Sequence, residues 1–120
     1  MLKVHTRNLG NVAVVGLQGR IVNGETASLR EAVFAQSNTS AIVLDMARVT
    51  AVDAGGLGML LELRRHAESN GVGLKLMNVS RFVRQVLEIT RLDSVFEIIP
   101  RVEPAITLTR PARVEYAACA

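Results

Sequence analysis

The sequence has few aromatic residues and a single cysteine, and each shortage excludes a kind of site. Its 120 residues include three Phe, one Tyr and no Trp, whereas proteins that bind single-stranded nucleic acid stack bases on aromatic side chains. The only cysteine is Cys119, so an internal disulfide and a cysteine-built metal site are both excluded. We therefore expect no nucleic-acid partner, no metal and no cofactor, and a reducing compartment.

Long apolar runs are missing too. No run reaches the roughly eighteen residues that a membrane-spanning helix requires, and the first ten residues carry Lys3, His5 and Arg7 where a signal peptide is apolar. The fourteen basic and eleven acidic residues are scattered along the chain, so the net charge of +3 forms no basic patch. We expect a cytoplasmic protein without membrane insertion.

The composition, 49% hydrophobic and 21% charged, is that of a globular domain. A chain of this length can bury roughly two thirds of its unfolded surface, which suffices for one core. No internal repeat or linker divides it. We expect one domain over residues 1–110 and a disordered tail over 111–120.

Strand and helix patterns alternate along the chain. The predicted strands are 4–7 and 12–17, which form a hairpin, and 41–46, 74–77 and 95–99. The predicted helices are 25–37, 55–69, one that is capped by Ser80 and uses Phe82, Val83, Val86 and Leu87, and a short one over 103–110. This order favours an α/β fold, with a mixed sheet of about five strands whose later strands are parallel and joined by right-handed crossovers.

Residues 45–58, between the central strand and the second helix, read DMARVTAVDAGGLG. The segment resembles the signature of the STAS family, in which a strand ends in an Asp and an Asp-Ser-Ser-Gly-Leu-Gly type sequence opens the next helix. The resemblance extends to residues 19–21, 74–78 and 86–92, and so spans nearly the whole domain. It implies the STAS fold, with an N-terminal hairpin and about four helices mainly on one face of the sheet.

The resemblance implies a regulatory protein and not an enzyme. In this family, an unphosphorylated anti-sigma factor antagonist captures an anti-sigma factor that is also a serine kinase, and so controls sigma-factor-dependent transcription. The implied partner is an anti-sigma factor or serine kinase, and we expect a monomer or weak homodimer. The alternative is a STAS scaffold or transporter-associated binding module without a phospho-switch.

Two departures from the family pattern affect this switch. The phosphorylatable serine falls on Ala54 and the serine after it on Gly55, and Val22 stands where many members have an acidic residue. We expect no phosphorylation at Ala54. Thr50, which we place in the loop before Asp53, is the nearest hydroxyl and the alternative acceptor.

The partner-binding residues that the resemblance implies are Asp53, Ala54, Gly55, Gly56, Leu57 and Leu61. Asp53 has a second reading as the N-cap of the helix, where its charge meets the positive end of the helix dipole. Glycines in a helix cost stability, which close packing on the sheet, a bare surface for a partner, or a phosphate at the helix start would explain.

Leu57 and Leu61 fall beside the stripe that we expect to face the sheet, which comprises Gly56, Met59, Leu60, Leu63 and Ala67. They either cover the edge of the sheet or form an exposed patch. If Leu57 is exposed, Leu57→Glu removes partner binding without lowering the melting temperature. His5 and His66 neighbour no nucleophile or second ligand, so we expect no catalytic site, and we expect His66 to be a solvated helix residue.

Overall fold

A hairpin followed by three parallel crossovers builds the sheet. The computed structural model describes residues 2–99. Strand β1 (Lys3–Leu9) pairs antiparallel with β2 (Val12–Ile21), and β3 (Ala41–Val52), β4 (Gly73–Met77) and β5 (Glu97–Ile99) follow in parallel, in the spatial order β1-β2-β3-β4-β5. The predicted α/β fold with a five-stranded mixed sheet is confirmed.

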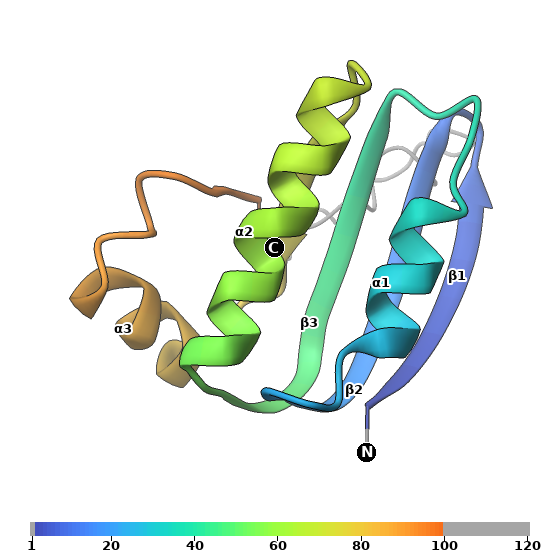
Figure 1. Ribbon diagram of the computed structural model, residues 1–120. Helices are drawn as coiled ribbons and strands as arrows, with labels where there is room; N and C mark the ends of the chain where they lie inside the picture. Colours follow the sequence, from blue (N-terminus) through green and yellow to red (C-terminus); the bar gives the residue numbers. More distant parts are fainter. Residues whose placement is uncertain (1, 100–120) are drawn as a thin grey trace, which may run out of the picture.

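The helices α1 (Ala27–Phe34), α2 (Ala54–Ser69) and α3 (Arg81–Ile89) connect the parallel strands. Each crossover advances by one strand in the same direction, and right-handed crossovers of this kind place their helices on one face of the sheet. Figure 1 shows α1 and α2 in front of the sheet, with α3 beside the start of α2. The short helix expected over 103–110 and the tail expected over 111–120 lie outside the described residues.

Strand β3 is twice as long as the apolar run 41–46 from which it is predicted. The apolar run marks only the first half of the strand, because only that half is buried on both faces of the sheet. Beyond Met46 the strand continues to Val52, with Arg48 and Thr50 exposed and Val49 buried. A bulge lies between the pairs Gly16–Asp45 and Gln18–Arg48. The strand therefore does not end near Asp45, as the sequence pattern indicates, but runs directly to the start of α2.

The main core lies between the sheet and the helices. Alternate residues of the strands meet the buried face of α2, whose members are Gly56, Leu57, Leu60, Leu63 and Ala67. Leu60 and Leu63 are fully buried, and burial of such a side chain stabilises the fold by about 1.5–3 kcal/mol. This apolar stripe therefore fixes how α2 lies on the sheet.

Helix α3 begins as predicted but is only partly covered. The Val83 N–H donates to the Ser80 hydroxyl at 3.1 Å, which confirms the N-cap. Val83 and Leu87 are buried, whereas Phe82, which we expected on the buried face, is 53% exposed. The apolar arc of this helix is wider than the strip that the sheet covers.

His66 is a partly exposed helix residue, but its surroundings are more specific than the sequence indicates. Its ring stacks on Phe34 of α1, with the ring centroids 3.9 Å apart and the planes at 14°. The Arg30 guanidinium also lies over the ring of Phe34, 4.6 Å from its centroid. The same guanidinium pairs with Glu62 of α2. His66 thus joins α1 to α2, a contact between residues far apart in the sequence.

Candidate functional site

The start of α2 is tied to the loop that follows β2 by one carboxylate. Oδ1 of Asp53 accepts the Gly56 N–H at 2.8 Å and the Asn23 N–H at 3.0 Å. The first bond caps the helix, which confirms the N-cap interpretation. The second bond joins residues that are thirty positions apart. Asp53 therefore holds together two segments that meet at the carboxyl ends of β2 and β3.

The same bonds set the charge at this position. The N–H groups of Gly56, and then of Asn23, hold the pKa of Asp53 below its usual value, because they stabilise the ionised form. The site therefore carries a fixed negative charge at neutral pH, at the positive end of the α2 dipole.

The glycines of α2 serve two different purposes. A Cβ on Gly56 would stand 1.9 Å from the carbonyl oxygen of Ile21, so this glycine lets the helix approach the end of β2. A Cβ on Gly58 would meet nothing within 4 Å. Close packing thus explains Gly56, which is buried and not available to a partner, whereas Gly58 leaves open surface.

Gly55 is exposed like Gly58, but like Gly56 it leaves no room for a side chain. It is exposed, but a Cβ there would stand 2.6 Å from the Cβ of Asn23. A side chain at this position would displace the loop that Asp53 holds. The family's second serine position is thus filled here by a residue that allows the loop to close on the helix.

The two leucines do not form an exposed patch. Leu57 is only 8% exposed and belongs to the core, while Leu61 is half-buried and packs against that core. The expectation that Leu57→Glu leaves the fold intact is therefore wrong. Leu57 therefore belongs to the buried face of α2, together with Gly56, Leu60, Leu63 and Ala67.

The two candidate acceptor positions differ in their surroundings. Ala54 is exposed in the first turn of α2. Thr50 lies within β3 and not in a loop, and its hydroxyl donates to the Gly19 carbonyl oxygen at 3.3 Å. Phosphorylation of Thr50 would break this bond between neighbouring strands.

The residues available to a partner are those that remain exposed around the Asp53 carboxylate. We call them the partner surface: Asn23, Gly24, Asp53, Ala54, Gly55 and Gly58. Apart from Asn23 and Asp53 they carry at most a methyl group. A low, negatively charged surface that exposes backbone is suited to contact with another protein and holds no nucleophile.

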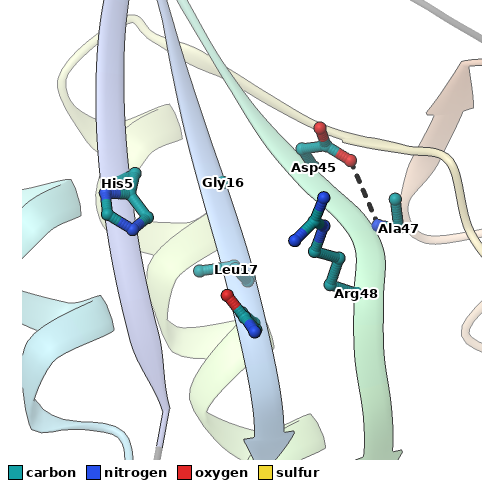
Figure 2. A pocket seen from close by; sticks show the side chains of 7 residues that line it. His5, Gly16, Leu17, Asp45, Ala47 and Arg48 are labelled. Atoms are coloured by element: carbon teal, nitrogen blue, oxygen red, sulfur yellow. Dashed lines mark hydrogen bonds between the residues drawn. The ribbon is translucent and has the colours of Figure 1, made fainter.

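A separate hollow of about 230 Å³ lies on the face of the sheet opposite the helices. Figure 2 shows His5 and Arg48 on either side of Gly16, with Asp45 above Arg48. Oδ1 of Asp45 accepts the Ala47 N–H and the side-chain amide of Asn78, each at 3.1 Å. The hollow is smaller than the roughly 300–1,000 Å³ of typical ligand pockets, and Asp45 already serves to hold the bulge.

The sequence patterns do not indicate that His5, Asp45 and Arg48 line one hollow. The signal lies in the register, which aligns His5 with Gly16 and Gly16 with Asp45.

Within residues 2–99, no three His, Cys, Asp or Glu residues are grouped closely enough to hold a metal ion. None of the helices in this range has the length and apolar character needed to cross a membrane.

Comparison with known proteins establishes the family. A model of the STAS domain matches residues 3–105. A "STAS-domain containing protein" of Pseudomonas aeruginosa is 33% identical over 90 residues, which cover 74% of this chain and 89% of the relative. The chain belongs to the STAS domain family, as the segment 45–58 indicates.

Solved structures share the fold. An anti-sigma factor antagonist from Mycobacterium paratuberculosis superposes with a TM-score of 0.72 at 23% identity, over 92% of this chain and 96% of that one. A sulfate transporter family protein from Wolinella succinogenes gives 0.70 at 22% identity, over 82% and 84%. One fold thus occurs in an anti-sigma factor antagonist and in a transporter-family protein, so these likenesses show the fold alone.

Proposed function

We propose that this chain is an anti-sigma factor antagonist-like regulator that binds an anti-sigma factor of the serine-kinase type and so controls sigma-factor-dependent transcription. One observation carries the proposal: the exposed start of α2, where Asp53 joins two loops and Ala54, Gly55 and Gly58 leave the backbone open. The similarity to the mycobacterial antagonist over nearly the full length of both chains supports it.

We further propose that the chain behaves as a permanently unphosphorylated antagonist. A phosphate adds about 1.5–2 negative charges, and next to Asp53 it would oppose binding of any surface that accommodates the carboxylate. Ala54 has no hydroxyl to accept it. The antagonist would thus be locked in the state that captures its partner.

A pair of arginine substitutions tests the partner surface. Gly58→Arg places a long charged side chain where a Cβ meets nothing within 4 Å, so the fold should persist while binding of the anti-sigma kinase is lost. Ser69→Arg is the matched control, exposed on the same side of α2 but eleven positions further along, about 16 Å away. Equal binding by both variants, measured by calorimetry, would contradict the proposed surface.

A second experiment tests the switch. After incubation with the kinase and ATP, the wild-type chain should keep its mass, while Ala54→Ser should gain one phosphate and then bind at least about tenfold more weakly, through charge repulsion in the interface. Thr50→Val is the control for the other hydroxyl. Phosphate on the wild-type chain that disappears in Thr50→Val would show that Thr50 has taken over the switch.

The second candidate is a STAS module that docks on a transporter or scaffold protein. Ala54 favours it, because such docking needs no phosphorylation, and the fold shared with the Wolinella protein supports it. This candidate predicts that the partner surface binds no kinase at all. The calorimetric experiment above therefore distinguishes the two.

A further inference from the structure

A β-bulge brings Arg48 into the hollow on the face of the sheet opposite the helices. Gly16 of β2 pairs with Asp45 of β3. The next pair on this face is Gln18 with Arg48, so β3 has one residue more than β2 between the two pairs. Without the extra residue, Ala47 would stand opposite Gln18 and Arg48 would point toward the helices. The bulge therefore turns a cationic side chain into the hollow, and Figure 2 shows it extending from β3 toward β2.

Gly16 leaves the floor of the hollow without a side chain, although neither packing nor backbone conformation requires a glycine there. Its φ is not positive, and a Cβ would stand at an ordinary contact distance, 3.6 Å from the carbonyl oxygen of His5. A glycine inside a strand weakens the strand, and it often marks a place where a ligand approaches the backbone closely. Gly16 therefore suits a floor on which a ligand lies.

The side chains around this floor are mostly cationic. Lys3, His5 and Arg7 occupy alternate positions of β1 and so share this face, and Arg48 lies across from them on β3. Within residues 2–99, Lys3, Arg7 and Arg48 form no ion pair with an acidic side chain. Asp45 is the acidic residue among those that line the hollow, and its Oδ1 already accepts two hydrogen bonds. Three cations and one carboxylate leave a surplus of positive charge around Gly16.

We propose that this hollow binds a small tetrahedral oxyanion, phosphate above all, over Gly16. The strands that carry His5 and Arg48 flank β2, so their backbones lie two strand spacings, about 10 Å, apart. In this gap the Arg48 guanidinium and the His5 ring can donate to one anion from opposite sides. The side-chain amide of Gln18, which also lines the hollow, supplies a donor from a third side. The small volume of the hollow excludes a ligand of ordinary cofactor size.

A tetrahedral dianion matches the hollow better than a carboxylate does. It balances the surplus of positive charge more completely, because it carries about twice the charge of a carboxylate. Its oxygens point in several directions and can meet donors on three sides, whereas the two oxygens of a carboxylate lie in one plane. Sulfate shares this shape and charge with phosphate, so both should bind. None of the lining residues belongs to the partner surface, so this site is independent of the contact proposed above.

Titration of the full-length chain with inorganic phosphate, followed by amide NMR spectra at constant pH and ionic strength, tests the site. The signals of Gly16, Gln18 and Arg48 should shift and saturate, with a dissociation constant on the order of 1 mM. Sulfate should act alike, and acetate should bind at least about tenfold more weakly. Arg48→Gln should weaken phosphate binding at least about tenfold. Arg65→Gln, which removes the same charge from an exposed position of α2, is the matched control and should bind within about twofold of the wild type.

A second variant tests where the anion lies. Gly16→Val fills the floor of the hollow and should abolish saturable binding without lowering the melting temperature, because valine favours a strand. Should this variant fail to fold, Gly16→Ala decides by the same reading, since its Cβ makes only an ordinary contact. Four results would overturn the proposal: shifts that rise linearly with phosphate, acetate that binds as tightly as phosphate, equal weakening by Arg48→Gln and Arg65→Gln, or undiminished binding by the folded Gly16 variant.

Discussion

The same substitution at two glycines of α2 should have opposite effects on stability. Gly56→Ala puts a Cβ 1.9 Å from the carbonyl oxygen of Ile21, an atom that is fixed because it accepts the Asp53 N–H. Helix and strand must separate by about 1 Å or more, and overpacking against backbone should cost the upper end of the usual range, about 3 kcal/mol. Gly58→Ala meets no atom and should stabilise the helix by about 0.5–1 kcal/mol.

Urea unfolding followed by far-UV circular dichroism measures both effects in a chain without tryptophan. With a dependence on urea of about 1–3 kcal/mol per molar, the midpoint should fall by at least about 1 M for Gly56→Ala and rise by a few tenths of a molar for Gly58→Ala. A Gly56→Ala midpoint within about 0.2 M of the wild type would refute the close approach as the reason for this glycine.

Three further predictions follow from the site and its surroundings. Leu57→Glu buries a charge in the core and should lower the free energy of unfolding by more than about 3 kcal/mol. A urea unfolding curve like that of the wild type would show that Leu57 is not a core residue. The lowered pKa of Asp53 means that its ionised form stabilises the fold above the unfolded-state pKa of about 3.9. The stability gap to Asp53→Asn should therefore stay constant from pH 7 to about 5 and shrink as the pH falls through the lowered pKa, and a gap that widens in acid would contradict this reasoning. Phe34→Ala removes the ring stack with His66 and should cost about 0.5–1.5 kcal/mol beyond the lost burial, as a double-mutant cycle with His66→Ala would measure.

The sequence was sufficient for those features that depend on local order. The alternation of strand and helix patterns predicts the sheet and its crossovers, because connection lengths and handedness allow few other arrangements. Ser80 and Asp53 could be identified as N-caps, because a cap bonds to an N–H group only three residues away. The family could be assigned from residues 45–58, which keep the order and spacing of its signature around the start of α2.

Features that depend on how segments pack were decided only by the tertiary structure. Whether Leu57 is core or surface depends on how α2 packs against the rest of the core, which the spacing along the helix does not determine. Gly56 and Gly58 look alike in the sequence and differ only because the Ile21 carbonyl lies against one of them. The bond from Asn23 to Asp53 and the stack of Phe34 on His66 likewise join residues that are distant in the chain. Local spacing carries no information about such contacts, since they form only when the whole sheet and its helices are assembled.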